Sequence, residues 1–206
     1  MTLDEMMRLA PVIPVLTIED AAHAVPLAQA LVAGGLRVLE VTLRTPEAIE
    51  AIRQMSQVEG AIVGAGTVLT SSDLDLVAAA GASFAVSPGL MEGAQADGPV
   101  PLLPGVATAT ELMRGLAHGF TAFKFFPAVP AGGAAALKSF APVFPQARFC
   151  PTGGISPENA GQFLALPNVA CVGGSWLAPL DAVRAGDWKR VTQLARACQL
   201  LRAKPG

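Results

Sequence analysis

The stretch LVAGGLRVLEVTLRTPEAIEAI, residues 31–52, contains the end of one predicted helix, a complete strand and the start of the next helix. Its central run, RVLEVTL at 37–43, is rich in β-branched residues, which favour strands. The Gly-Gly pair at 34–35 ends a helix, and the Thr-Pro-Glu triplet at 45–47 supplies a cap residue, a proline at the first helical position and an acid in the first turn. The stretch therefore predicts the order helix, strand, helix.

Seven similar runs repeat this plan along the chain. They are PVIPVL (11–16), AIVGAG (61–66), SFAVSP (83–88), VPLLPG (100–105), TAFKFF (121–126), ARFCPTG (147–153) and VACVGG (169–174). Strands that alternate with helices form βαβ units and a parallel sheet. Eight units in 206 residues leave about 26 residues per unit, which is tight for a (β/α)8 barrel of roughly 250 residues but sufficient with short loops.

An open doubly wound sheet is the alternative architecture, and it would gather functional residues at one switch point. In this chain, polar residues and paired glycines recur after runs two, three, six, seven and eight, which one ring of loops on a closed barrel explains better. We therefore expect an α/β fold: a single (β/α)8 TIM barrel domain over residues 1–206, with a short N-terminal helix.

Further helix signals between the runs are capping-box spacing at 17–20 and 108–111, a cap–proline–acid triplet at 156–158, and helix-ending glycines at 81 and 119. The last helix is predicted at about 187–202, with an apolar stripe on one face. Pro26 lies inside the first predicted helix and predicts a kink there.

Composition restricts the function classes. The chain is 52% hydrophobic and 15% charged, so it is not disordered. A net charge of −2 gives no basic footprint for nucleic acid, and no apolar run approaches the roughly 18 residues of a membrane span. The N-terminus carries acids where a signal peptide has basic residues. Cys150, Cys171 and Cys198 are odd in number, lie far apart in the sequence and form no CxxC pair, which is typical of reduced thiols in the core of a cytosolic protein. We expect a cytoplasmic protein that binds neither nucleic acid nor membranes.

Period-two alternation in RVLEVTLR, residues 37–44, places Glu40, Thr42 and Arg44 on one face of a strand. The apolar other face should meet the helices, so Glu40 and Arg44 are expected to point into the barrel. Barrel interiors are normally filled by branched apolar side chains. The two residues either form a buried salt bridge, which adds little stability over apolar packing, or serve as a base and an anion clamp. We favour the second interpretation.

The hexapeptide FKFFPA, residues 123–128, places Lys124 among aromatic and apolar residues. The same alternation directs Lys124 and Phe126 to the barrel interior and the neighbouring phenylalanines to the helices. A lysine at a strand end often extends to water, but this amine points to the barrel axis, as Glu40 does. Apolar surroundings and a nearby positive charge both lower the pKa of a lysine, and a neutral amine is a nucleophile. Lys124 is therefore the candidate catalytic residue.

Two glycine loops follow runs seven and eight: CPTGGIS at 150–156 and VGGSW at 172–176. In barrels these loops commonly bind a phosphate through backbone N–H groups, because glycine permits a close approach. Ser175 adds a hydroxyl, and Thr152 faces the space between the predicted phosphate site and the lysine.

Thr67, in GAGTVLT after the third run, either assists Arg44 or begins the next helix, and the sequence leaves both interpretations open. His23 and His118 have no acidic or cysteine neighbours at ligand spacing, so no metal site is predicted.

Taken together, these motifs resemble those of the bacterial 2-keto-3-deoxy-6-phosphogluconate (KDPG) and 4-hydroxy-2-oxoglutarate (KHG) aldolase family. They are LVAGGLRVLEVTLRTPEAIEAI, IVGAGTVLT, FAVSPGL, FKFFPA, RFCPTGGIS and VGGSWL, and they span roughly residues 11–190 in order. The resemblance implies a class I Schiff-base aldolase of the Entner–Doudoroff pathway, a homotrimer of barrels that needs no metal or other cofactor. The segment 91–99 is shorter than the resemblance leads us to expect, which puts a helix there in question.

By position, the resemblance implies that Lys124 forms the Schiff base and that Glu40 is the acid/base. The substrate-binding residues that it implies are Arg44 and Thr67 at the carboxylate, Phe126 beside the pyruvyl group, Thr152 near the C4 hydroxyl, and Gly153, Gly154, Gly174 and Ser175 at the phosphate. The expected reaction cleaves KDPG to pyruvate and glyceraldehyde 3-phosphate. Two rivals are the same chemistry on the C4 epimer, 2-keto-3-deoxy-6-phosphogalactonate, and a non-catalytic phosphometabolite-binding barrel, which has no use for a buried lysine beside Glu40.

Overall fold

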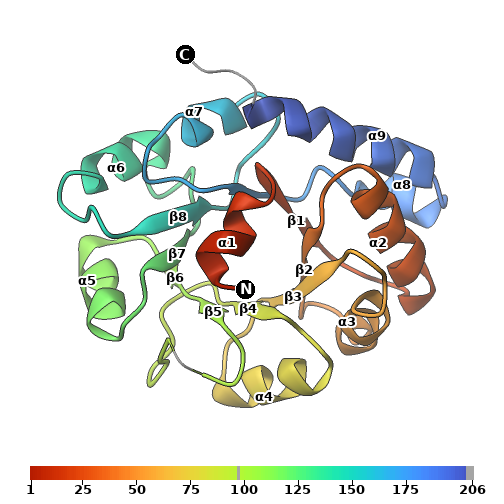
Figure 1. Cartoon of the computed structure of the whole chain (residues 1–206), viewed down its shortest axis with the longest axis horizontal. Coiled ribbons are helices and arrows are strands. Elements are labelled where there is room, and N and C mark those ends of the chain that lie inside the picture. The colour runs from red at the N-terminus through yellow and green to blue at the C-terminus, as the bar shows by residue number, and fades with distance from the viewer. Residues whose placement is uncertain (97, 203–206) are drawn as a thin grey trace.

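A closed ring of parallel strands, surrounded by helices, is the architecture of the chain (Figure 1). The computed structural model describes residues 1–96 and 98–202. The strands are β1 (Val12–Leu16), β2 (Val38–Thr42), β3 (Ile62–Gly66), β4 (Phe84–Val86), β5 (Leu102–Leu103), β6 (Gly105–Val106), β7 (Ala122–Phe125), β8 (Arg148–Pro151) and β9 (Val172–Gly174). Each of the eight predicted runs contains a strand, so the predicted strand plan is confirmed.

The ring is built from two sheets, one in the order β5-β4-β3-β2-β1-β9 and one in the order β6-β7-β8. Isolated parallel bridges, from Phe149 to Val169 and from Thr152 to Gly173, join β8 to β9. On the other side only Pro104 separates β5 from β6, because proline has no N–H to donate to a ladder. Its carbonyl still accepts from the N–H of Lys124 at 2.9 Å. The expected TIM barrel is confirmed.

Helices surround the ring in Figure 1, except for the first one, which lies over its centre. They are α1 (Leu3–Arg8), α2 (Ala24–Ala33), α3 (Ala48–Met55), α4 (Ser71–Ala79), α5 (Ala109–Ala117), α6 (Gly133–Phe140), α7 (Ala160–Leu164), α8 (Leu180–Arg184) and α9 (Trp188–Gln199), with short 3-10 turns at Ala21–His23 and Leu200–Arg202. The expected N-terminal helix is α1, and α9 lies within the predicted last helix. None of the described residues of 91–99 is helical.

Three predicted helix starts are wrong in detail. The hydroxyl of Thr17 lies 3.3 Å from that of Thr42 instead of capping a helix, and Asp20 caps a 3-10 turn before α2. Pro26 therefore lies in the first turn of α2, where its missing N–H costs no intrahelical hydrogen bond, and the expected kink has no cause. α3 begins at Ala48, directly after the predicted triplet at 45–47, and α7 begins at Ala160, two residues after the triplet at 156–158, so that Glu47 and Asn159 are the N-caps.

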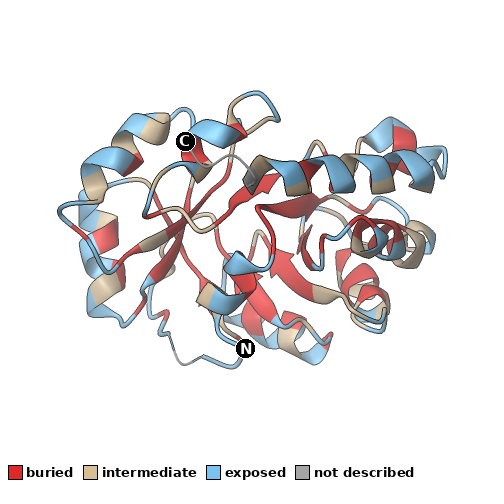
Figure 2. Cartoon of the chain, turned by 45° about the horizontal axis from the view of Figure 1, so that its top comes forward, coloured by how far each residue is buried: buried red, intermediate tan, exposed pale blue. Residues whose placement is uncertain are grey.

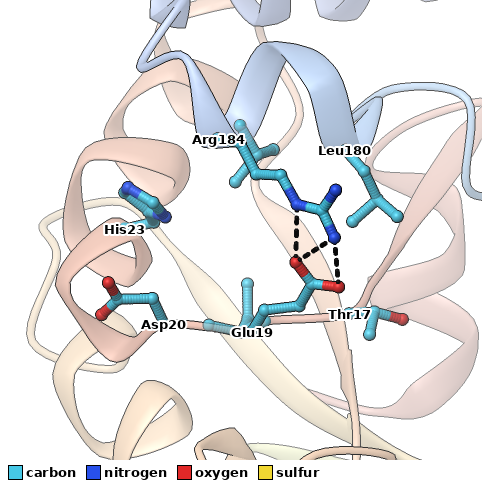
Figure 3. A pocket seen from close by; sticks show the side chains of 8 residues that line it. Thr17, Glu19, Asp20, His23, Leu180 and Arg184 are labelled. Atoms are coloured by element: carbon cyan, nitrogen blue, oxygen red, sulfur yellow. Dashed lines mark hydrogen bonds and ion pairs between the residues drawn. The ribbon is translucent and has the colours of Figure 1, made fainter.

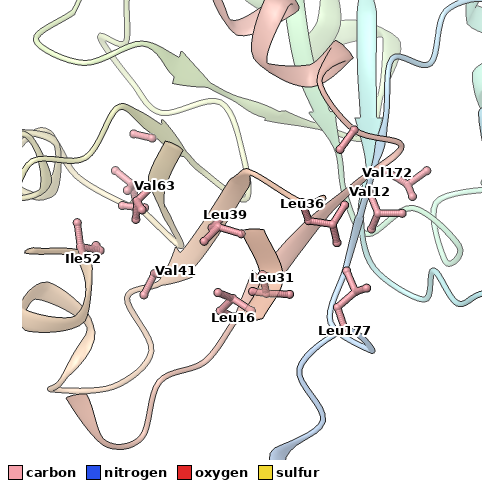
Figure 4. Close-up of a cluster of buried hydrophobic side chains, with 14 of the residues drawn as sticks. Val12, Leu16, Leu31, Leu36, Leu39, Val41, Ile52, Val63, Val172 and Leu177 are labelled. Carbon is pink, nitrogen blue, oxygen red and sulfur yellow. The ribbon is translucent and has the colours of Figure 1, made fainter. Parts of the chain in front are cut away.

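Apolar side chains fill two separate regions, one on each side of the strands. Outside the ring, side chains such as Leu39 and Val41 of β2 pack against Leu31 of α2 and Ile52 of α3 (Figure 4). Inside the ring, a smaller cluster consists of Met6, Met7, Ile13, Val38, Phe84, Val86, Leu103, Ala122, Cys150 and Cys171. Helix α1 supplies the two methionines, so it closes one end of the barrel.

Burial follows the same plan: the strands are almost entirely buried, and the helices expose their outer faces (Figure 2). All three cysteines are buried thiols, as expected. Within the described part of the chain, no helix has the length and apolar composition needed to cross a bilayer.

Candidate active site

A lysine and a glutamate meet inside the barrel. Lys124 on β7 and Glu40 on β2 are only 4% and 3% exposed, and Nζ of Lys124 donates to Oε1 of Glu40 at 3.2 Å. Both inward orientations were predicted from the strand alternation. Phe123 and Phe125, on the other face of β7, are fully buried against the outer core, again as predicted.

Aromatic surface and small residues surround the amine. Nζ of Lys124 lies 5.3 Å from the ring centroid of Phe126, a distance at which a ring stabilises a cation. On β6 and β8, the residues in register with Lys124 are Gly105 and Cys150. The amine therefore has one charged partner, Glu40, in otherwise apolar surroundings, and such a group is a candidate nucleophile.

Arg44 does not lie inside the barrel, which corrects the prediction from alternation. Strand β2 ends at Thr42, and the N–H of Arg44 donates to the carbonyl of Thr42 at 2.8 Å as the chain turns. The side chain of Arg44 is exposed at this end of the strand. The alternative of a buried Glu40–Arg44 salt bridge is also wrong, because Glu40 pairs with Lys124.

Thr67 has an unusual backbone conformation. With φ of 61°, it is the only non-glycine residue with positive φ among the residues described. A β-branched residue in this region is strained by roughly 1–3 kcal/mol, and such strain is concentrated at functional sites. The N-cap of α4 is Thr70, so Thr67 does not begin the helix, and that interpretation is excluded.

The two glycine loops supply backbone donors. Gly153 and Gly154 have φ of 100° and 76°, a region that favours glycine. The N–H groups of Gly153, Gly154 and Ser175 have no acceptor among the described residues, although the carbonyls of Thr152 and Gly153 accept from the loop after β7. Backbone N–H groups that have no acceptor within the protein can bind an anion.

Two predicted residues of this region are held by packing. Thr152 is buried, and its side chain fills the space that a β-carbon on Gly173 would take. The Trp176 ring covers Gly174 in the same way. Side chains of both loops, Thr152 and Trp176, therefore pack against β9.

Comparison with known proteins assigns the family. The family model described as "Aldolase: KDPG and KHG aldolase" matches residues 3–194. The chain belongs to this family. A KHG/KDPG aldolase of Escherichia coli is 54% identical to it over 197 residues, which cover 94% of this chain and 92% of that protein.

Solved structures of the KDPG aldolase family have the same fold. A Legionella pneumophila KDPG aldolase, with pyruvate captured as a covalent carbinolamine intermediate, superposes with a TM-score of 0.92 at 48% identity and covers 95% of this chain and 97% of its own. A Zymomonas mobilis KDPG aldolase with 3-phosphoglycerate gives a TM-score of 0.88 at 54% identity, covering 96% and 95%.

The sequence did not indicate a pocket that lies away from Lys124 and Glu40. It has a volume of about 220 Å³ and lies between the segment after β1 and helix α8. Nε and Nη2 of Arg184 donate to the Glu19 carboxylate across it, and Asp20 and His23 lie to one side of this ion pair and Leu180 to the other (Figure 3). The glutamate and aspartate had been interpreted only as helix-start signals, because their partners lie far away in the sequence.

In the part of the chain that is described, no group of three or more His, Cys, Asp or Glu side chains is arranged so that it could hold a metal ion. His118 caps the end of α5, with Nδ1 3.2 Å from the amide of Gln95, and His23 lies beside the Trp188 ring. Both histidines therefore have local structural roles.

Proposed function

We propose that this chain is a class I Schiff-base aldolase that cleaves KDPG to pyruvate and glyceraldehyde 3-phosphate. One observation carries the proposal: the amine of Lys124 lies 3.2 Å from the carboxylate of Glu40, with both groups buried. A nucleophile within hydrogen-bond reach of a base is the arrangement that covalent catalysis needs. The carbinolamine of pyruvate in the Legionella relative is the adduct expected from attack by such an amine.

The first half of the mechanism forms an electron sink. Neutral Lys124 attacks the C2 ketone, and the carbinolamine takes up one proton from solvent and loses water to give an iminium; that proton is released again when the iminium is hydrolysed. Glu40 removes the proton of the C4 hydroxyl, the C3–C4 bond breaks, and its electron pair moves toward the iminium nitrogen to give an enamine. Glyceraldehyde 3-phosphate leaves. Protonation of the enamine at C3 and hydrolysis of the iminium then release pyruvate and restore the amine.

We assign the remaining roles by position, as the resemblance to the family implies. Arg44 and Thr67 hold the substrate carboxylate at the open end of the barrel, and Phe126 lines the pyruvyl pocket. Thr152 binds near the C4 hydroxyl. We assign the phosphate to the two glycine loops, with the N–H groups of Gly153, Gly154 and Ser175 as donors and Gly174 beside them. The 3-phosphoglycerate in the Zymomonas relative is consistent with a site for a phosphorylated three-carbon unit.

Trapping tests the proposal. Borohydride with pyruvate should inactivate the protein and label Lys124, as read by peptide mass mapping. The exposed Lys138 and Lys189 provide internal controls, because a label on either of them would refute the assignment. Binding of pyruvate without trapping, together with no release of glyceraldehyde 3-phosphate from KDPG, would support a non-catalytic binding barrel.

We further propose that the enzyme is a homotrimer of single-domain barrels and that it acts in the cytoplasm. Exposed apolar surface of the kind that a subunit contact needs is present at Leu69, which is 58% exposed and lines a groove with Leu90 and Met91, and at Leu76 of α4, which is 51% exposed. Buried thiols suit a reducing compartment. Light scattering should give a mass three times the 21.0 kDa of one chain, and a monomer would contradict the trimer.

A further inference from the structure

Two of the three residues on the inner face of β3 are glycines, Gly64 and Gly66, and the third is Ile62. Gly64 lies in register with Glu40 of β2, and Gly66 lies in register with Thr42. Neither glycine has a positive φ, so neither is required by the backbone conformation. A side chain at either position would point into the barrel, because the two alternate with the outward-facing Val63 and Ala65. What distinguishes the two is the group that fills the space in front of each.

The Phe84 ring fills the space in front of Gly64, whereas the Glu40 carboxylate fills the space in front of Gly66. A β-carbon on Gly66 would overlap Oε1 of Glu40 and lie 2.8 Å from both Cγ and Cδ. Three atoms of one side chain therefore occupy the missing methyl group's place. The same Oε1 accepts from Nζ of Lys124 at 3.2 Å, so the carboxylate cannot move away from Gly66 without changing that contact.

We infer that Gly66 is a positioning residue, whose missing side chain forms the recess that holds Glu40 against Lys124. The inference rests on the proposed function for its catalytic meaning. Gly66 touches no reacting atom itself and acts through Glu40. A methyl group at position 66 displaces the carboxylate of Glu40 from the amine of Lys124. Lys124 itself and Arg44, which binds the substrate carboxylate, are unchanged. The substitution should therefore reduce the rate of proton transfer much more than the affinity for the substrate.

Gly66→Ala tests this separation of steps, with Gly64→Ala as the matched control on the same face of the same strand. Pyruvate and borohydride should still label Lys124 in Gly66→Ala, because the amine is intact. Its kcat for KDPG cleavage should fall roughly 10²–10³-fold, with KM changed less than about threefold. Gly64→Ala should lower the melting temperature but keep kcat within a few-fold of wild type in the folded protein. Equal kcat losses in the two variants would overturn the inference.

A thermal-unfolding cycle with Glu40→Ala tests the recess without any substrate. In the wild-type background, Gly66→Ala should lower the melting temperature by about 5 °C because of the overlap. In the Glu40→Ala background the overlapping atoms are gone, so the same substitution should cost almost nothing. An equal loss in both backgrounds would overturn the inference. If Gly66→Ala alone does not fold, the double variant should still fold like Glu40→Ala.

The two measurements also separate this inference from the proposed function. A wild-type protein that neither traps pyruvate nor cleaves KDPG would refute the function. The thermal cycle would still decide whether Gly66 forms the recess for Glu40.

Discussion

Glu40 and Lys124 come from opposite sides of the barrel, yet their side chains meet at 3.2 Å inside it. Around the ring from β2 to β7, three strands intervene one way (β1, β9 and β8), and three strand positions the other way (β3, β4 and the interrupted β5–β6). The two groups are 84 positions apart in the sequence. Barrel closure therefore brings together groups that no short segment could.

Glu40→Gln should separate imine formation from cleavage. The amide keeps the shape of the carboxylate but cannot act as a base, so kcat for KDPG should fall roughly 10²–10⁴-fold. Trapping of pyruvate on Lys124 should persist. Steady-state kinetics with parallel trapping provide the measurement. An unchanged kcat with a raised KM would show that Glu40 only positions the substrate.

Arg44→Ala should act on binding more than on the chemical step. A guanidinium that binds a carboxylate does so in both ground and transition states, and a charged hydrogen bond contributes about 1.5–3 kcal/mol. The pyruvate concentration for half-maximal trapping should therefore rise about 10–150-fold. Arg53→Ala, on the outer helix α3, is the matched control and should leave it unchanged. Trapping at wild-type concentrations in Arg44→Ala would exclude the clamp.

Chelation should leave the reaction rate unchanged, since the iminium of Lys124 supplies the electron sink that a metal supplies in other aldolases. The measurement is KDPG cleavage before and after prolonged dialysis against a strong chelator. Activity that is lost and then restored only by a divalent ion would replace the Schiff-base mechanism with a metal-dependent one.

Strand periodicity made the central pair predictable. Period-two alternation is a local property of an extended backbone, so it placed Glu40 and Lys124 correctly without any knowledge of their partners. It failed at Arg44 because β2 ends at Thr42 and the chain turns, while the alternating pattern in the sequence continues. Where a strand ends depends on its hydrogen-bonded neighbours, which a single run does not reveal.

The capping box predicted at 108–111 is present, but other helix starts and the recess at Gly66 could not be predicted, for a related reason. The hydroxyl of Thr45 donates to the carbonyl of Ile18, and that of Thr17 contacts the hydroxyl of Thr42. These two residues, which the sequence pattern predicts as helix caps, therefore form hydrogen bonds with groups far away in the sequence. The role of Gly66 could not be predicted either, because it depends on a side chain of the neighbouring strand.

The capping box of α4 predicts a pH effect on stability that is independent of catalysis. The pKa of Asp73 is lowered, mainly by a hydrogen bond from the N–H of Leu69; burial opposes this effect, and hydrogen bonds from Thr70 add to the lowering. A carboxylate with a lowered folded-state pKa stabilises the fold above its unfolded pKa of about 3.9 and loses that contribution as the pH falls through the folded value.

Asp73→Asn should therefore be less stable than wild type at neutral pH, with a difference in unfolding free energy that shrinks below about pH 4. Denaturant titrations at several pH values measure it, and a constant difference would contradict the capping role. Thr70→Ala should cost about 1 kcal/mol at neutral pH without altering kcat.

The phosphate site can be tested by removing the phosphate from the substrate. The N–H groups of Gly153, Gly154 and Ser175 have no acceptor among the described residues, and together they can bind a dianion. Binding energy from such a remote group orients C2 against Lys124 and therefore affects kcat as well as KM. Unphosphorylated 2-keto-3-deoxygluconate should lose roughly 10²–10⁴-fold in kcat/KM, about 3–5 kcal/mol.

Ser175→Ala separates the hydroxyl from the backbone donors at this site. It should reduce kcat/KM for KDPG by only about 1 kcal/mol, because the N–H groups remain. Cleavage of 4-hydroxy-2-oxoglutarate, which carries no phosphate, should be unaffected by the same substitution and is the control. Steady-state kinetics on the three substrates decide the outcome. Equal kcat/KM for the phosphorylated and unphosphorylated sugar acids would mean that these loops bind no phosphate, and the enzyme would then be an aldolase for simple keto acids that still uses Lys124.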